Sequence, residues 1–282
     1  MSLLAALVLA ASVAPAAPAA PRLAANGTVL EVTLADGAVR RSPELIGAVL
    51  WIATGDGGAA RVRLDAVEPD PTDTTGTVFL HSVTTQDQSG NWVPICDPGP
   101  DGRRQAIPLA GQAAPDGMLT PTTNTDFTLV CTGGARAKCV RFGYHPWQGG
   151  EALRRYNACV RLVRADYGGT HAYTRNGMTI DLYDDRGIQK PEPGDTMPFE
   201  AGWTEAGAVC VAHPRVPENG SLADIVAANP RLAGRVGPAV CTEANARASL
   251  RQALHEIRVV FQTVGFDGLQ ADKRSIALEP SR

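Results

Sequence analysis

The residues that could do chemistry gather in one stretch near the middle of the chain. It holds Asp166, His171 and Asp181, followed by the adjacent pair Asp184 and Asp185. Carboxylates near a histidine can act as general acid and base in hydrolysis. Carboxylate oxygens are also the ligands that Ca²⁺ prefers. The pattern therefore makes these five residues candidates for a hydrolytic or metal-dependent site.

A structural interpretation explains the same residues and is preferred. The acids do not follow the alternating order, ending in Gly and Glu, that a helix-loop-helix calcium site needs. Residues 184–187, Asp-Asp-Arg-Gly, are typical of a turn, and Asp166 can accept hydrogen bonds from backbone amides or an arginine. We therefore expect no catalytic residue, no metal and no cofactor, and keep an enzyme built on Asp166, His171 and Asp181 as the alternative.

Other functional signatures are missing from the sequence. It contains no G-x-S-x-G, P-loop, G-x-G-x-x-G or H-E-x-x-H pattern, and the residues after His255 do not complete the last of these. His213, before Pro214, is interpreted as a packing or surface residue. The 26 basic residues are interspersed among 29 acidic ones, for a net charge of -3, which excludes the basic patch of a nucleic-acid partner.

The chain has six cysteines, and no two of them form a C-x-x-C pair. They are Cys96, Cys131, Cys139, Cys159, Cys210 and Cys241. An even number in an exported chain predicts disulfides rather than zinc thiolates. The sequence leaves the pairing open: Cys131 could pair with Cys139 across a short turn, and Cys96 is an equal partner for either.

The beginning of the chain predicts export. Residues 3–13 form a short apolar run, followed by an Ala/Pro-rich stretch. The run is too brief for a membrane-spanning helix, which needs about 20 residues. Small residues in A-x-A spacing predict a signal peptide over 1–19, cut after Ala16 or Ala19, with an uncleaved leader as the alternative. We expect an extracytoplasmic location, periplasmic or secreted, and no transmembrane segment in the mature chain.

One helix must hold the candidate site, and it is expected from Glu151 to Arg164. Its apolar residues recur at helical spacing: Leu153, Tyr156, Val160 and Val163. Its arginines are Arg154, Arg155, Arg161 and Arg164. We interpret these arginines as a solvated face rather than an anion site, because no glycine-rich phosphate loop accompanies them.

The sequence before this helix favours antiparallel strands. Alternating or β-branched runs lie at 28–34, 48–53, 61–67 and 77–84, bounded by Gly, Asp or Pro. They predict a β-rich N-terminal unit over 26–96 with one polar face. Trp92 is interpreted as core or sheet cover rather than as a platform for a ligand.

The remaining sequence completes an α+β fold. Residues 97–126 are rich in Pro, Gly, Asp and Thr and predict a loop or linker. A disulfide-stabilised mixed α/β domain is expected over 127–265, followed by a flexible tail over 266–282. It should end in a long helix after Thr242. The apolar stripe of that helix is Leu250, Leu254, Ile257, Phe261 and Val264.

Four separated runs resemble one protein family. They are GARAKCVRFGYHPW at 134–147, ACVRLVRADY at 158–167, IDLYDDRGIQ at 180–189 and GAVCVAHPR at 207–215. In this order they are similar to the ADYC-domain family of bacterial exported proteins, over roughly 127–244. The resemblance implies an exported bacterial domain and brings no reaction with it. Gly168 stands where the family has its motif cysteine, which implies a structural motif rather than cysteine chemistry.

Overall fold

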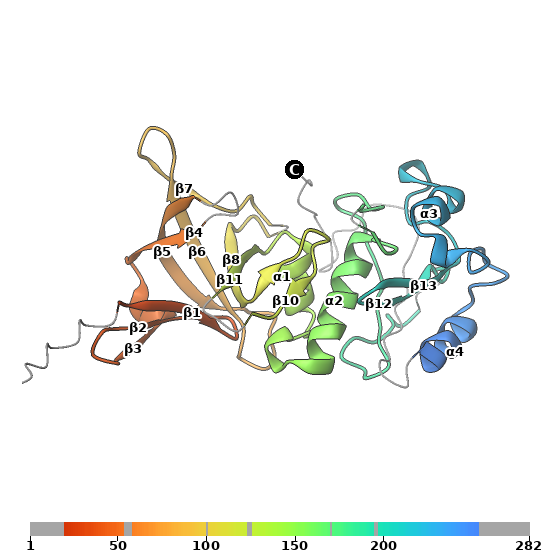
Figure 1. Cartoon of the computed structure of the whole chain (residues 1–282), viewed down its shortest axis with the longest axis horizontal. Helices are drawn as coiled ribbons and strands as arrows, with labels where there is room; N and C mark the ends of the chain where they lie inside the picture. The colour runs from red at the N-terminus through yellow and green to blue at the C-terminus, as the bar shows by residue number, and fades with distance from the viewer. Residues whose placement is uncertain are drawn as a thin grey trace, which may run out of the picture.

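The computed structural model describes most of the chain. The described residues are 20–53, 58–99, 101–122, 126–169, 171–194 and 197–253. The strands β1 to β7 lie at one end, helices α1 and α2 lie in the middle, and β12, β13, α3 and α4 lie at the other end (Figure 1). Among the residues described, no helix is both long and apolar enough to cross a membrane.

The N-terminal half is built from antiparallel sheets, as the alternating pattern predicts. The first has the order β1-β2-β3, with β1 (Arg22–Asn26), β2 (Val29–Thr33) and β3 (Val39–Arg41). The second has six strands in the order β11-β8-β6-β5-β4, with β7 also pairing with β6. Its strands are β4 (Val49–Ala53), β5 (Ala59–Pro69), β6 (Phe79–Gln86), β7 (Trp92–Pro94), β8 (Gln105–Ala110) and β11 (Phe127–Cys131). A short pair, β9 (Gln112–Ala113) with β10 (Leu119–Thr120), and a 3₁₀ turn, η1 (Ser42–Leu45), complete this half.

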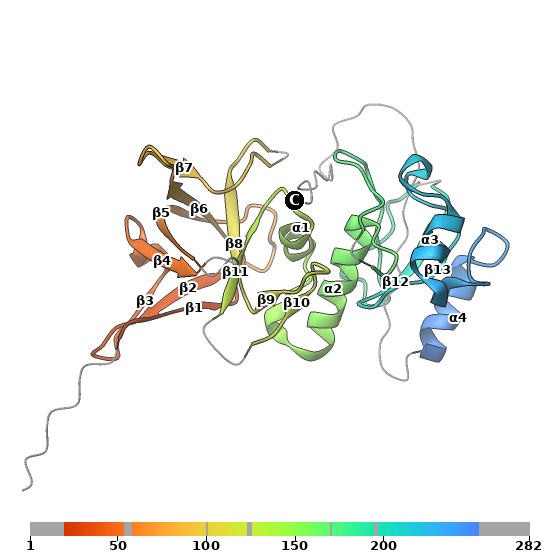
Figure 2. The same ribbon diagram turned by 45° about the horizontal axis from the view of Figure 1, so that its top comes forward.

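A small apolar core holds the two sheets together at this end, where Figure 2 shows them meeting. Its buried members come from both sheets and η1: Leu30, Leu45, Val62, Leu64 and Val83. On β5 the inward residues alternate with the outward-facing Arg61 and Arg63. The period of two thus separates core from solvent as expected for a sheet packed on one face.

The prediction of a loop over 97–126 is wrong in the middle of that range. Residues 105–110 form β8, which lies inside the larger sheet between β11 and β6 and is buried at five of its six positions. Pro108 hides the strand from sequence reasoning, because proline cannot donate to a ladder. The pairing of β8 with β6 covers only Gln105 and Ala106, so Pro108 lies beyond it. The sheet therefore crosses the predicted boundary between the two domains.

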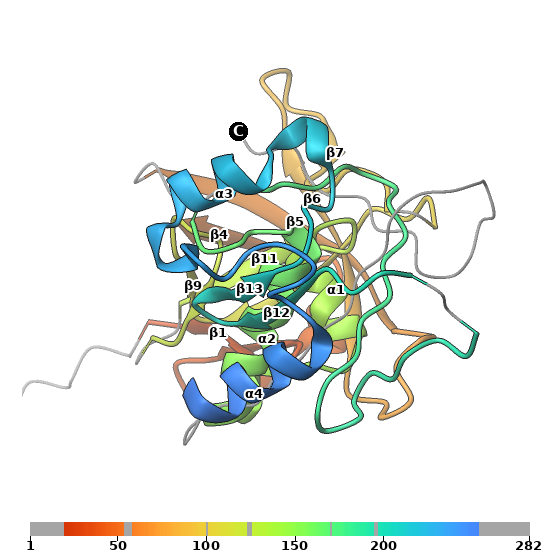
Figure 3. The same ribbon diagram turned by 90° about the vertical axis from the view of Figure 1, so that its right-hand side faces the viewer.

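The second half is mainly helical. Its elements are α1 (Ala135–Arg141), η2 (Pro146–Gln148), α2 (Gly150–Arg164), β12 (Ala201–Thr204), β13 (Gly207–Val211), η3 (Pro217–Asn219), α3 (Leu222–Ala228), η4 (Pro230–Leu232) and α4 (Glu243–Ala253). Strands β12 and β13 form an antiparallel hairpin, and Figure 3 shows α3 and α4 on opposite sides of it. Ser221 caps α3 by accepting a hydrogen bond from the amide of Asp224, as its position before the helix predicts.

Helix α2 is the centre of the main core, and its prediction is confirmed. Tyr156, Val160 and Val163 are buried, and Leu153 packs against them. The helix ends where Ala165 adopts a left-handed conformation, with φ of 47°. The same core takes in residues of β6, β8, α1, β12 and β13. Helix α2 therefore joins the sheet end of the molecule to the hairpin end.

Three disulfides reinforce this arrangement. Cys96 pairs with Cys131, and Cys210 pairs with Cys241. Cys139 pairs with Cys159, which ties α1 to α2. The sequence suggests only a tight segment back to Cys139. The sequence does not predict α1, because the helix has only seven residues and the two glycines before it are typical of a turn.

The C-terminal helix is short rather than long. Helix α4 has 11 residues and contributes Leu250 to a small cluster with Tyr183 and Val209. The rest of the predicted stripe, from Leu254 onward, lies outside the described residues, as do the predicted signal peptide and tail.

Candidate functional site

Asp166, the first candidate, is fully buried just after α2. Its Oδ2 accepts a hydrogen bond from Arg161 Nη1 at 2.7 Å. Its Oδ1 accepts from the amides of Gly168 and Gly169, at 3.1 and 2.8 Å. Burial raises the pKa of this carboxyl, and the positive charge of Arg161 and the two amides oppose that rise. All its contacts fix the turn that follows α2.

His171 lies apart from this carboxyl and is exposed. Its ring meets the edge of the Tyr173 ring, with centroids 4.4 Å apart. Tyr173 in turn packs against Tyr167. The histidine is therefore the outer layer of an aromatic stack rather than the partner of an acid.

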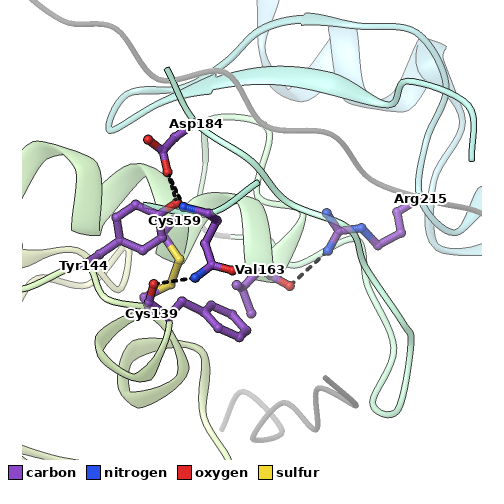
Figure 4. The surroundings of a disulfide bond; sticks show 8 residues. Cys139, Tyr144, Cys159, Val163, Asp184 and Arg215 are labelled. Carbon is purple, nitrogen blue, oxygen red and sulfur yellow. Dashed lines mark hydrogen bonds between the residues drawn. A yellow bond between two sulfur atoms is a disulfide. The ribbon is translucent and has the colours of Figure 1, made fainter. Parts of the chain in front are cut away.

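The three later acids bind different partners and do not converge on one another. Asp181 accepts a hydrogen bond from the amide of Glu192 and is buried. Asp184 accepts from the Tyr144 hydroxyl at 2.8 Å (Figure 4) and from the amide of Gln189. Asp185 accepts from Arg155 Nη1 at 2.6 Å. Residues 184–187 form the predicted turn, but no strand leads into it.

The acidic cluster does not assemble into a metal centre. Within the described ranges, no group of three or more His, Cys, Asp or Glu side chains is placed to hold a metal ion. None of the six cysteines is a free thiol.

The arginines of α2 are not the solvated face that the sequence suggests. Arg155 and Arg161 are 3% and 6% exposed. Arg155 bridges Asp185 and Glu151. Arg161 binds Asp166 and Asp116, at 2.7 and 2.6 Å, and donates to the carbonyl oxygens of Glu205 and Gly169. Asp116 is 45 residues away in the sequence, so helical spacing alone could not show that Arg161 is paired and buried.

Sequence reasoning also missed the most deeply buried ion pair of the described residues. Arg215 and Glu200 have fully buried side chains, and Arg215 Nε lies 3.1 Å from Glu200 Oε2. The Tyr167 hydroxyl donates to Glu200 Oε1 at 2.8 Å and accepts from the Arg215 amide at 2.9 Å. Arg215 Nη1 also donates to the carbonyl oxygen of Val163 on α2. Figure 4 shows Val163 near the Cys139–Cys159 disulfide. We call Tyr167, Glu200 and Arg215 the buried lock.

The buried lock has the electrostatics of a structural element. Burial raises the pKa of the Tyr167 hydroxyl well above its usual range, and the charge of Glu200 adds to the rise. Tyr167 therefore stays a neutral donor at ordinary pH. Each polar group of the lock has a partner, which is the condition for burying charges without a large loss of stability. The sequence signals for it are the two motif runs that end in Tyr167 and Arg215; Glu200 lies outside both.

Gly168 lies against another arginine. Its φ is 138°, and a Cβ atom there would overlap the Arg231 guanidinium. Arg231 donates to the carbonyl oxygens of Tyr167, Ala206 and Ala208. Glycine is therefore required here both by the backbone conformation and by the side chain that fills the adjacent space.

A modest cavity lies beside the side chains that bind Asp184 and Asp185. It has a volume of about 200 Å³ and is lined by Tyr144, His145, Glu151, Arg155 and Ile188, among others. Tyr144, Glu151 and Arg155 are already bound to Asp184, Arg186 and Asp185 respectively. The polar side chains that line the cavity are thus already bonded to other residues of the protein.

Comparisons with known proteins give one match. A family model described as ADYC domain matches residues 42–217. This span begins earlier and ends earlier than the resemblance over roughly 127–244, and it includes all six strands of the larger sheet. The search of curated proteins finds no match, and the search of solved structures finds none either.

Proposed function

The chain belongs to the ADYC-domain family, and we propose that it is an exported, disulfide-stabilised bacterial protein that acts as a non-catalytic binding or structural module. The observation that carries this proposal is the use of the motif residues. Asp166 and Tyr167 are both fully buried. The Asp166 carboxylate accepts from the Arg161 side chain and from two backbone amides, and the Tyr167 hydroxyl donates to Glu200 and accepts from the Arg215 amide. A catalytic acid or base needs a substrate within hydrogen-bond reach, and these side chains are enclosed by the fold.

The cysteines support the extracytoplasmic location in this proposal. Three disulfides join residues 20 to 35 positions apart. Disulfides persist in oxidising compartments and are rare in the reducing cytosol. Together with the apolar leader sequence, they favour a periplasmic or secreted protein.

The glycine at position 168 supports a structural role for the motif. The resemblance places a cysteine at this position in the family, whereas this chain has Gly168 with the Arg231 side chain beside it. All six cysteines pair without it. We infer that the family cysteine is dispensable in this chain, because Arg231 occupies the space and ties the same turn to β13.

Metal analysis of the natively exported protein tests the non-catalytic proposal. We expect less than a tenth of an equivalent, roughly, of Ca²⁺ or Zn²⁺ per chain after dialysis, because the acids that prefer such ions already have internal partners. The Asp181→Asn variant should have the same metal content as the wild type. One bound ion per chain that is lost in Asp181→Asn would support the alternative, a metal-dependent enzyme or hydrolase, and overturn the proposal.

A further inference from the structure

A row of aromatic and polar side chains crosses the solvent face of the larger sheet. Trp51 on β4 is the cross-strand partner of Arg61 on β5. Arg61 donates a hydrogen bond to the Gln86 side chain on β6 at 3.1 Å, and Gln86 pairs with Trp92 on β7. Figures 1 and 2 both place β4 to β7 at the end of the molecule away from α3 and α4. We call Trp51, Arg61, Gln86 and Trp92 the tryptophan row.

The row is open to solvent although it carries two indoles. Trp51 is 67% exposed. Trp92, expected to be core or sheet cover, is partly exposed. The Arg61 guanidinium lies 5.9 Å from each of the two indole rings. The guanidinium of Arg63 lies 4.6 Å from Trp92. These cation–π contacts hold the indoles in fixed positions, so the row is a preformed platform and not a pair of loose side chains.

The charges along the row leave one cation available. Arg63 is neutralised by Asp65 on the same strand. Arg61 is exposed and makes no ion pair with any residue that the structure describes. An anionic group placed between the two indoles would meet this guanidinium, and a guanidinium binds a carboxylate through two parallel hydrogen bonds.

We propose that the tryptophan row binds an acidic polysaccharide, a chain of pyranose rings that carry carboxylates. The C–H bonds on one face of a pyranose ring have positive hydrogen atoms, which match the negative face of an indole. Trp51 and Trp92 then stack on separate sugar rings, while Arg61 binds the carboxylate between them and Gln86 bonds a hydroxyl. This inference rests on the proposed function as a binding module and names its ligand class.

The geometry favours this ligand over other macromolecules. Each indole ring centroid lies 5.9 Å from the Arg61 guanidinium, so the two rings are at most twice that distance apart, which suits an extended chain lying flat across the sheet. A nucleic acid would need several phosphate contacts to bind at physiological salt, whereas the row has one unpaired arginine on a chain of net charge -3. The two indoles stack on sugar rings through C–H bonds, so a polysaccharide needs only one of its carboxylates to meet Arg61.

Titration calorimetry with purified galacturonate hexamers tests the proposal on the full-length mature protein. Wild type should bind, and Trp51→Ala should bind about tenfold more weakly, the effect of losing one stacked ring. Val240→Ala is the matched control, because Val240 is an exposed apolar residue outside the row, and it should bind like wild type. The Arg61→Gln variant should have the same affinity for the acidic hexamer as for the hexamer methyl ester, a neutral ligand of similar shape.

Several results would overturn the proposal. The wild type could fail to bind at millimolar hexamer, or Trp51→Ala could bind the hexamer as tightly as the wild type does. The wild type could bind an oligothymidylate as tightly as the hexamer, or it could self-associate in a way that Trp51→Ala abolishes. Release of new reducing ends from the hexamer would instead contradict the non-catalytic function. If the hexamer neither binds nor is cleaved, the proposal of a polysaccharide ligand is wrong, and the proposed non-catalytic function is unaffected.

Discussion

At the scale of single residues, burial determines which polar groups affect stability, and His81 is the clearest case. It is fully buried on β6, with its Nε2 2.8 Å from Ser42 Oγ. Ser42 Oγ also accepts a hydrogen bond from the Leu30 amide, so the histidine and η1 are joined to β2. Burial lowers the pKa of His81 to about 4. The ring is therefore neutral in the folded protein at ordinary pH.

This histidine predicts how stability changes with pH. In the unfolded chain its pKa is about 6.5, so between pH 6.5 and 4 the unfolded state binds the extra proton. The contribution of neutral His81 is complete above pH 6.5 and is lost as the pH falls toward 4, by up to about 1.4 kcal/mol per pH unit. Urea unfolding at pH 7.5, 6 and 5 should show a smaller decline for His81→Gln than for wild type.

A matched variant controls for the other groups that titrate in this range. His171→Gln removes an exposed histidine and should keep the wild-type decline. Equal declines in wild type and His81→Gln would show that the buried ring does not cause the effect.

Residue-scale prediction from sequence identified the right amino acids but not their surroundings. Asp166 was expected to bind backbone amides or an arginine, and it does both. Arg161 was expected on a solvated face, but it is enclosed because Asp116 and Asp166 approach it from different loops. The burial of a charged side chain depends on distant partners, which a single sequence does not show.

At the scale of elements, α2 is the organising helix. Its apolar spacing predicted it, and the strands β2, β4, β5 and β6 followed from their alternating or β-branched runs. Strand β8 was missed because of Pro108, and α1 because a short helix carries little periodic signal. Helix α1 is fixed on two sides: Arg141 pairs with Asp70, just beyond the end of β5, at 2.7 Å, and Cys139 is bonded to Cys159 on α2.

The α1–α2 disulfide gives an element-scale prediction. Cys139 and Cys159 are fully buried and lie 20 residues apart. The Cys139→Ala/Cys159→Ala double variant should lose about 3 kcal/mol of unfolding free energy, because its unfolded chain is no longer cross-linked. Urea unfolding under non-reducing conditions measures the loss.

The same measurement with the disulfides reduced is the control. Wild type and the double variant should then approach each other in stability, since both lack this cross-link. An unchanged unfolding free energy under non-reducing conditions would mean that the bond does not stabilise the joint between α1 and α2.

At the scale of the whole molecule, the buried lock connects the two motif runs at 158–167 and 207–215, which lie far apart in the sequence. Tyr167 follows α2, Glu200 precedes β12, and Arg215 lies beyond β13, yet the three meet in the buried lock. The α+β class and the presence of disulfides were predictable from composition and cysteine number. The meeting of these three residues was not, because it follows from how α2 and the hairpin pack.

The central claim is that the motif residues Tyr167 and Arg215 hold the fold together through their contacts with Glu200, rather than performing a reaction. Its most direct test compares Glu200→Gln with Glu218→Gln by urea unfolding. Glu200 is fully buried against Arg215, whereas Glu218 pairs with Arg175 and its side chain is 70% exposed. Removing one partner of a buried ion pair typically costs about 3–5 kcal/mol, and removing one of an exposed pair about 1 kcal/mol or less.

We therefore predict that Glu200→Gln lowers the unfolding free energy by about 3 kcal/mol or more, while Glu218→Gln stays close to wild type. Replacing an active-site residue often leaves the stability of the protein unchanged or raises it. A Glu200→Gln protein as stable as wild type would contradict the structural role of the motif.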